Sequence, residues 1–255
     1  MSDVIMDNNQ EIDQAIERYI PLTQQRHPFT SSIEQRSVEW FALRKGRLSG
    51  SVCSSLLFIK TKEDLQLEYD RIFNNGPPKT FTAEVKKLME FGTIHEMSAI
   101  KTLLQHFKHV KVFECGLKPS DKIPFLAASP DGVIQDTITG NYCAFEIKCP
   151  NGKRYRRRDG LTKPYDKIPY YYVLQLYLEM FCLNMKKCLF MCWSQTGSKI
   201  WVVDFDQVLW EEILQFLQAF KDNTCEFSEF KDKQLHLKLI SLPKFVKRYS
   251  QSIDI

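Results

Sequence analysis

The sequence of 255 residues is long enough for one large domain with a substantial core, or for two small ones. Hydrophobic residues make up 44% and charged residues 26%, as in ordinary soluble globular proteins. No run approaches the roughly 18 apolar residues of a membrane span, and the polar N-terminus (Asp3, Asp7, Glu11) excludes a signal peptide. We therefore expect an intracellular protein of the cytoplasm or nucleus with no membrane partner. A net charge of +4 permits an anionic partner without indicating one.

The eight cysteines form no CxxC pair and show no zinc-site spacing. Cys182, Cys188 and Cys192 stand in apolar surroundings, which is typical of buried structural cysteines. We expect them to be reduced core residues, in agreement with an intracellular compartment.

The chain opens with a predicted helix over residues 8–20, which Pro21 ends, and a looser segment runs to about Ser32. Residues 37–58 predict a helix, a short connection and a second apolar run. The first helix has a candidate buried face of Val38, Trp40, Phe41 and Leu43, and its basic residues are Arg44, Lys45 and Arg47.

Ser49, Gly50 and Ser51 offer capping side chains before that second apolar run. A helix start beside an arginine and serine hydroxyls is a natural phosphate site. Taken alone, the stretch is more simply a corner between two helices with exposed basic residues.

Two longer helices are predicted next. Residues 61–73 begin with the capping signal Thr61-Lys62-Glu63-Asp64, and residues 82–107 carry apolar residues at helical spacing. Gly92, inside the second helix, costs ~1 kcal/mol relative to alanine, so we expect another group to approach closely there. Glu96 lies one turn after Gly92 and, taken alone, is a solvated helix charge.

The most informative stretch spans residues 125–150. Two β-rich runs, at 132–134 and 142–147, flank the turn Thr139-Gly140-Asn141 and predict a β-hairpin. By themselves, Ser129-Pro130-Asp131-Gly132 is an ordinary turn and Glu-x-Lys on a strand is a solvated cross-strand pair.

Strand geometry gives the hairpin a chemical meaning. Residues two apart on a strand share a face, so Glu146 and Lys148 project together while Ile147 turns into the core. The hairpin also returns its second strand beside Asp131, so two carboxylates and one ammonium are expected to converge. Such oxygen ligation suits Mg²⁺ or Mn²⁺. A lysine there can orient a water or stabilise charge on a phosphate.

A basic loop follows the hairpin directly. It contains Lys153, Arg154, Arg156, Arg157, Arg158, Lys163 and Lys167. A nuclear-import signal or a solvated loop would explain such a run. Its position after the second strand instead favours a lining of the entrance to the metal site, where a phosphate backbone passes. Tyr155 and Tyr165 could stack on an unpaired base there.

The rest of the chain predicts further core elements. Pro169 opens a helix that is apolar nearly all round, in which Gln175 by itself is a core glutamine bonded to backbone. Strands are predicted at 187–193 and 200–204, and a helix at 207–220. No conformation is predicted for residues 231–255.

Several motifs occur in one order that is far more specific than any of them alone. They are Trp40…Arg44-x-x-Arg47-Leu-Ser-Gly-Ser51, Gly92-x-x-x-Glu96, Ser129-Pro-Asp131-Gly, Glu146-x-Lys148-Cys-Pro and Tyr172-x-x-Gln175. The pair Pro-Asp and Glu-x-Lys matches the PD-(D/E)xK signature of metal-dependent nucleases. Over about residues 37–205 the sequence resembles the phage lambda exonuclease-like family, the viral recombination exonucleases also called alkaline exonucleases.

The resemblance implies an α/β (α+β) fold, with a mixed central β-sheet flanked by helices in a restriction-endonuclease-like core. It places an exonuclease domain at 33–222, between an N-terminal helical extension (1–32) and a C-terminal extension (223–255). It also implies 5′ to 3′ digestion of one strand of linear double-stranded DNA. The alternatives are an endonuclease with the same metal site and a non-catalytic module that binds DNA ends.

The resemblance further assigns roles residue by residue. Asp131 and Glu146 would bind Mg²⁺, with the carbonyl of Ile147, Lys148 would position the attacking water, and Glu96 would lie at the edge of the site. Two ions are expected, with Mn²⁺ as a substitute. The expected DNA-binding residues are Arg44, Ser51, Ser129, Tyr172, Gln175, Arg154, Arg156, Arg157 and Arg158. Expected partners are DNA ends and a single-strand annealing protein, and the expected assembly is a monomer or a homotrimer.

Overall fold

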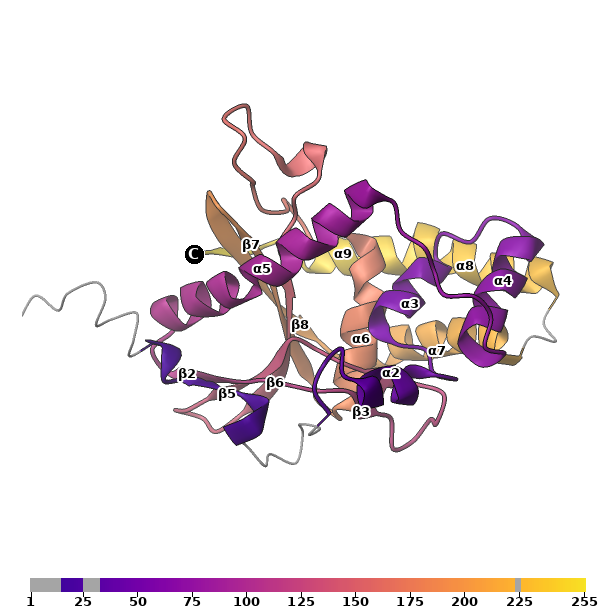
Figure 1. Cartoon of the computed structure of the whole chain (residues 1–255), viewed down its shortest axis with the longest axis horizontal. Coiled ribbons are helices and arrows are strands. Elements are labelled where there is room, and N and C mark those ends of the chain that lie inside the picture. Colours follow the sequence, from indigo (N-terminus) through magenta and orange to yellow (C-terminus); the bar gives the residue numbers. More distant parts are fainter. Residues whose placement is uncertain (1–14, 25–32, 223–225) are drawn as a thin grey trace, which may run out of the picture.

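The computed structural model describes residues 15–24, 33–222 and 226–255 (Figure 1). Within these ranges a seven-stranded sheet forms the centre, in the spatial order β1-β2-β5-β6-β7-β8-β9. Its strands are β1 (Tyr19–Ile20), β2 (Val110–Phe113), β5 (Gly132–Asp136), β6 (Tyr142–Lys148), β7 (Lys187–Ser194), β8 (Gly197–Asp204) and β9 (Ile253–Asp254). The pairs β1–β2 and β6–β7 are parallel and the remaining neighbours are antiparallel. The sheet is therefore mixed, as predicted.

Helices cover both faces of the sheet (Figure 1). The α-helices of the described residues are α2 (Val38–Arg44), α3 (Gly50–Leu56), α4 (Lys62–Phe73), α5 (Ala83–His106), α6 (Val173–Cys182), α7 (Gln207–Asp222), α8 (Phe227–His236) and α9 (Leu242–Arg248). Shorter elements are 3₁₀ turns at Leu22–Gln24, Lys153–Tyr155 and Tyr170–Tyr172, a π-helical turn at Leu237–Ser241, and a small ribbon of β3 (Lys118–Pro119) and β4 (Ala127–Ala128). None of the helices in the described part of the chain has the length and apolar character needed to cross a membrane.

Capping residues set the start of the predicted helices. The side chain of Thr61 accepts a hydrogen bond from the Asp64 amide at 3.1 Å, and Thr82 accepts one from Val85 at 3.3 Å. Each threonine satisfies an amide that the first turn of a helix leaves unpaired. The predicted helices at 61–73 and 82–107 are confirmed as α4 and α5.

The predicted hairpin is confirmed as β5 and β6. The Asp136 carboxylate accepts hydrogen bonds from the amides of Ile138 and Thr139, at 2.8 and 3.1 Å, and Gly140 adopts φ +73° in the same turn. Gly132 pairs with Phe145 across the two strands. The next position in this register is Asp131 opposite Glu146.

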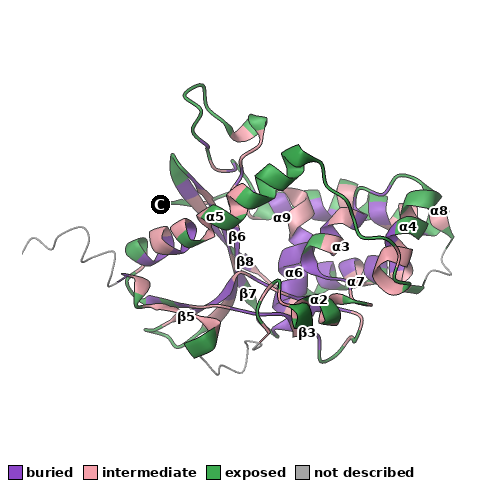
Figure 2. Cartoon of the chain, viewed as in Figure 1, coloured by how far each residue is buried: buried purple, intermediate pink, exposed green. Residues whose placement is uncertain are grey.

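Alternate residues of β6 enter two different cores. Ala144 belongs to the larger cluster, which contains α3, α6, α7, α8 and α9, whereas Phe145 and Ile147 belong to a smaller cluster with α5. Glu146 and Lys148 therefore face the α6 side of the sheet. α6 is buried over nearly its whole length, as its apolar sequence predicts, while the first half of α5 is exposed (Figure 2).

Three predictions near the ends of elements need correction. Residues 8–14 of the predicted helix at 8–20 lie outside the described residues, and Tyr19–Ile20 form strand β1, paired with β2. Pro169 does not open α6; a 3₁₀ turn at Tyr170–Tyr172 precedes it. The expected buried face of α2 is wrong, because Val38 is 82% and Phe41 58% exposed.

The C-terminal residues join the main core. Phe230 of α8 and Phe245 of α9 belong to the same cluster as α6 and α7, and β9 pairs with β8. β1 and β9 thus add strands to the central sheet from both flanks of the range 33–222, whose boundaries stay a prediction. The seven cysteines of the described residues are free, and Cys182, Cys188 and Cys192 are buried as expected.

Candidate active site

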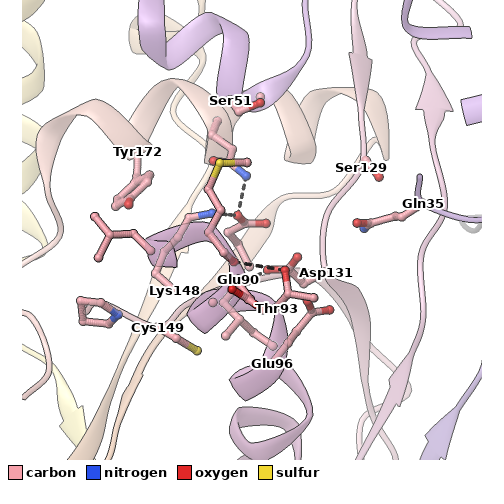
Figure 3. Close-up of a pocket in the computed structure, with 18 of the residues that line it drawn as sticks. Gln35, Ser51, Glu90, Thr93, Glu96, Ser129, Asp131, Lys148, Cys149 and Tyr172 are labelled. Carbon is pink, nitrogen blue, oxygen red and sulfur yellow. Dashed lines mark hydrogen bonds and ion pairs between the residues drawn. The ribbon is translucent and has the colours of Figure 1, made fainter. Parts of the chain in front are cut away.

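A pocket of about 810 Å³ lies where the end of β6 meets α3, the first half of α5 and the start of α6. Its walls include ten of the residues expected to act in catalysis or binding: Arg44, Ser51, Glu96, Ser129, Asp131, Glu146, Ile147, Lys148, Tyr172 and Gln175. Figure 3 shows Asp131 and Glu96 close together on one side of the pocket, with Ser51 and Tyr172 on others. Segments far apart in sequence therefore meet at one site.

Glu146 is almost completely enclosed, at 1% exposure. Its Oε1 accepts hydrogen bonds from Lys148 Nζ and from Gln175 Nε2. Its Oε2 is buried and has no hydrogen-bond partner among the residues that the structure describes. A buried carboxylate oxygen without a donor is costly, and a cation or a water is the kind of group that removes that cost.

Asp131 precedes β5 and faces Glu146. Its Oδ2 accepts a hydrogen bond from the backbone N–H of Ile147 at 2.7 Å, which ties it to β6. Burial, and then the charges of Glu146 and Glu96, raise the pKa of Asp131 well above its ordinary value. The site thus gathers more negative charge than its own residues neutralise.

Lys148 and Glu96 complete the charged group. Burial acts to lower the pKa of Lys148, but Glu146 and Asp131 outweigh it and raise that pKa, so the side chain is an ammonium ion. Burial and the charge of Glu146 raise the pKa of Glu96, against the effect of the Arg36 guanidinium. Glu96 reaches the pocket from α5, the helix on the other face of the sheet.

The donor set fits a hard divalent cation such as Mg²⁺ or Mn²⁺. Such ions take oxygen ligands and keep several waters, so two carboxylates of one site suffice as protein anchors. Asp131 and Glu146 provide them, and the free Oε2 of Glu146 is a ready ligand atom. Within the described ranges, no three His, Cys, Asp or Glu side chains form a complete metal cage. The remaining ligands would be waters, substrate oxygens and a backbone carbonyl.

The raised pKa of Asp131 predicts a stability effect in metal-free protein. Between its unfolded pKa of about 4 and its higher folded pKa, the native state holds a proton that the unfolded state has lost. The contribution of Asp131 to the free energy of unfolding is therefore greatest below this window and is lost as pH rises through the folded pKa. Because an Asn amide oxygen can still accept the Ile147 N–H, Asp131→Asn should raise the free energy of unfolding at pH 8 by about 1–2 kcal/mol.

Urea unfolding in EDTA at pH 8 and pH 4.5 measures this difference. Asp136→Asn is the matched control. Hydrogen bonds from Thr139 and Ile138 lower the pKa of Asp136, so removing the charge of this side chain should not raise the free energy of unfolding. An Asp131→Asn protein that is no more stable than the wild type at pH 8 would contradict the interpretation.

The wall of the pocket also carries groups suited to phosphate, here called the phosphate-binding wall: Arg44, Ser51 and Ser129. The Arg44 guanidinium lies 4.1 Å from the ring centroid of Trp40 and donates to Ser49 Oγ at 2.6 Å. Trp40 Nε1 in turn donates to Ser129 Oγ at 3.2 Å. Trp40, predicted on a buried helix face and with no binding role, therefore joins two predicted phosphate-binding side chains, and exposed Ser51 also lines the pocket.

Gln175 differs from the expected core glutamine. Its Nε2 donates to carboxylates, Glu146 and Glu179, rather than to backbone. A Cβ added at Gly50 would lie 2.6 Å from Gln175 Cγ, so α3 approaches α6 this closely only because residue 50 is glycine. Tyr172, one turn earlier, places its ring 5.0 Å from Lys148 Nζ. Gly92 shows no comparable contact with the described residues and instead opens onto the pocket.

The basic loop departs from its expected place. Asn151, Gly152 and Tyr155 line the pocket, whereas Arg154, Arg156, Arg157 and Arg158 are exposed and do not. The loop stands out from the body of the protein (Figure 1). Arg156 Nε donates to Asn151 Oδ1 at 3.0 Å, and Arg157 pairs with Asp159 at 3.3 Å. Tyr165 also lines the pocket, but it is 5% exposed and packs against Tyr155, which leaves little of its ring surface for stacking on a base.

Glu179 and Arg36 are among the pocket residues that the sequence analysis did not single out. Glu179 lies one turn after Gln175 on α6 and is 1% exposed; the four-residue spacing of two polar side chains in an apolar helix was its only signal. Arg36 donates to Thr93 Oγ1 at 2.9 Å and adopts φ +68°, an uncommon backbone conformation that sequence alone does not reveal.

The mixed sheet, with Asp131, Glu146 and Lys148 at the end of one hairpin, defines a PD-(D/E)xK core. Residues 39–186, more than half of the chain, match the family model of the YqaJ-like viral recombinase domain, and the chain belongs to this family. Membership supports a nuclease that acts on DNA. No curated protein sequence matches the chain.

Solved structures share the fold. An alkaline exonuclease of Laribacter hongkongensis, LHK-Exo, is similar with a TM-score of 0.54 and 22% identity, over 82% of this chain and 100% of that chain. The structure of LHK-Exo in complex with dAMP gives a TM-score of 0.55 with the same identity and coverage.

Proposed function

We propose that the protein is a Mg²⁺-dependent exonuclease that degrades one strand of linear double-stranded DNA in the 5′ to 3′ direction. The observation that carries the proposal is the convergence of Asp131, Glu146 and Lys148 in one pocket, where Glu146 Oε2 is buried and receives no hydrogen bond from the described part of the chain. The similarity in fold to an alkaline exonuclease supports it.

Asp131 and Glu146 would hold the metal, proposed as a pair of Mg²⁺ ions that Mn²⁺ can replace. When bound there, the ions supply Lewis-acid chemistry, polarising the scissile phosphate and making a water acidic. Lys148, kept charged by the two acids, orients the attacking water and stabilises negative charge that develops on the phosphate. Glu96 adds a third carboxylate at the edge of the site.

The phosphate-binding wall would give the enzyme a preference for the 5′ end of a DNA strand. Arg44 is permanently charged and is held in place by Trp40 and Ser49, and Ser51 and Ser129 offer hydroxyls nearby. A terminal 5′-phosphate carries more charge than an internal diester, so this wall favours it and holds the end of the strand in register with the acids. Association with a single-strand annealing protein, and the choice between a monomer and a homotrimer, stay predictions.

The experiment compares a linear duplex, labelled at its 5′ or 3′ end, with a covalently closed circle of the same sequence. A 5′ to 3′ exonuclease releases the 5′ label first as mononucleotide, retains the 3′ label longest and leaves the circle intact. Cutting of the circle would identify the alternative endonuclease. Binding of ends without release of either label would identify a non-catalytic module.

The exposed arginines of the loop are proposed to contact the DNA backbone outside the pocket. Arg156→Ala, Arg157→Ala and Arg158→Ala combined should weaken binding of all sequences alike, and should reduce the slope of log K against log salt by roughly 0.9 for each phosphate that is no longer neutralised. The cleavage rate at saturating DNA should change little, because these side chains do not line the pocket.

Fluorescence anisotropy of a labelled duplex over a range of salt concentrations measures the slope. A triple variant with Lys62→Ala, Lys108→Ala and Lys111→Ala removes the same charge from other exposed positions and serves as control. An equal slope in the loop variant and the wild type would leave the loop as a solvated segment or a nuclear-import signal.

A further inference from the structure

α6 buries two polar side chains among apolar ones. Gln175 is 8% and Glu179 1% exposed, and their neighbours Leu174, Leu176 and Leu178 belong to the larger core. A carboxylate is almost never fully buried unless it has partners that repay its desolvation. Burial also raises the pKa of Glu179 well above its ordinary value. Because the burial of its carboxylate destabilises the fold, Glu179 is a candidate for a functional role.

A single nitrogen connects Glu179 to the active site. Gln175 Nε2 donates to Glu179 Oε1 at 2.8 Å and also to Glu146 Oε1. An amide nitrogen has two hydrogens, so these two bonds use all of its donors. Glu179 has no other side-chain hydrogen bond among the described residues, and its Oε2 is buried without a partner. Its hydrogen-bonded connection to Glu146 therefore runs through Gln175.

This bond fixes which way the amide of Gln175 faces. Turned by half a rotation, the amide would present its oxygen to two carboxylates and lose both bonds. The close packing of Gly50 against Gln175 Cγ leaves the side chain little room to move aside. With Nε2 held toward Glu146, Oε1 of that acid receives both Gln175 and Lys148, and Oε2 stays free.

We propose that Glu179 is a positioning residue that acts through Gln175 to orient Glu146, so that Oε2 of Glu146 is presented to the divalent cation. The inference rests on the proposed metal site. Groups that orient the ligands of a metal typically change its affinity by 10- to 100-fold when they are removed. Glu179 lies one step further out, so its removal should weaken metal binding by about tenfold.

Isothermal titration calorimetry of the full chain with Mn²⁺, in the absence of DNA, tests this directly. Glu179→Met keeps the size of the side chain and removes the acceptor, and it should raise the Kd for Mn²⁺ by about tenfold. Glu179→Gln keeps an acceptor oxygen for Gln175 and should stay within about twofold of the wild type. Urea unfolding of each variant establishes that the protein titrated is folded.

A double-mutant cycle tests the route through Gln175. Gln175→Met should itself weaken Mn²⁺ binding, and adding Glu179→Met to it should change the Kd no further. Additive effects of the two substitutions would contradict the positioning role.

Wild-type affinity in Glu179→Met would overturn this inference alone, whereas wild-type protein that binds no Mn²⁺ would overturn the proposed metal site and the inference with it. If Glu179→Met does not fold, the Mn²⁺ affinity of Glu179→Gln decides the test. An affinity as low as that of Gln175→Met would overturn the inference, and an affinity close to that of the wild type would support it.

Discussion

Asp131→Asn, Glu146→Gln and Lys148→Met should each reduce the rate of DNA cleavage by about 10³-fold or more, equivalent to ~4 kcal/mol of transition-state stabilisation. The three side chains share one pocket, where the carboxylates would anchor the metal and the ammonium faces the same space. Each substitution keeps the size of the side chain while removing its charge. Phosphate contacts elsewhere in the pocket remain, so affinity for a duplex should change by less than about tenfold.

Single-turnover digestion of an end-labelled duplex measures the rate, and anisotropy in Ca²⁺ or EDTA measures binding separately. Glu90→Gln is the matched control, because Glu90 is an exposed acid that also lines the pocket yet has no assigned role. Cleavage at nearly the wild-type rate by purified Asp131→Asn protein would refute the assignment of the site.

Arg44→Ala should remove most of a preference for 5′-phosphorylated ends. The wild-type protein is expected to digest a 5′-phosphorylated duplex faster than a 5′-hydroxyl duplex, because a charged hydrogen bond to a terminal phosphate contributes ~1.5–3 kcal/mol. The variant should lose about 10- to 100-fold on the phosphorylated end and much less on the hydroxyl end. The expected signature is therefore a change in the ratio of two rates.

Parallel time courses on the two duplexes give that ratio for each protein. Arg47→Ala is the matched control: Arg47 stands three residues further on and donates to the backbone carbonyls of Leu43 and Pro124, outside the pocket wall. Equal rates on both ends in the wild-type protein would contradict the phosphate-binding wall even if the nuclease assignment held.

Local patterns predicted much of the fold. Thr61 marks a helix start through a bond that spans three residues, and the alternation of strand residues predicts the shared face of Glu146 and Lys148. The predicted hairpin returns its second strand beside its first, and it therefore places Asp131 next to Glu146 and Lys148. These signals lie within a few residues of each other, so the sequence carries them directly.

Other features depend on contacts between distant segments. β1 is two residues long and exists through pairing with β2, some 90 positions later, so its own residues give no strand pattern. An apolar stripe indicates that α2 has an apolar face but not what covers it, and Val38 and Phe41 of that face stay exposed. Glu179 is linked to Glu146 through Gln175, whereas its charge alone predicts a solvated residue.

The role of the basic loop is also only partly predictable from its sequence. A run of arginines predicts an anionic partner or a solvated surface, but the direction in which each side chain points depends on how the loop is anchored. The backbone and hydroxyl of Thr162 bond to Gln195 and Thr196 in the turn after β7, which fixes the base of the loop and leaves its arginines outside the pocket.

The central claim, that this pocket carries out metal-dependent hydrolysis of DNA, is tested most directly by release of acid-soluble nucleotides from a uniformly labelled linear duplex. We predict no release in EDTA, release on addition of Mg²⁺ or Mn²⁺, and none in either condition from the Asp131→Asn protein. Equal release in EDTA and in Mg²⁺, or no release by the wild-type protein with either ion, would contradict the account.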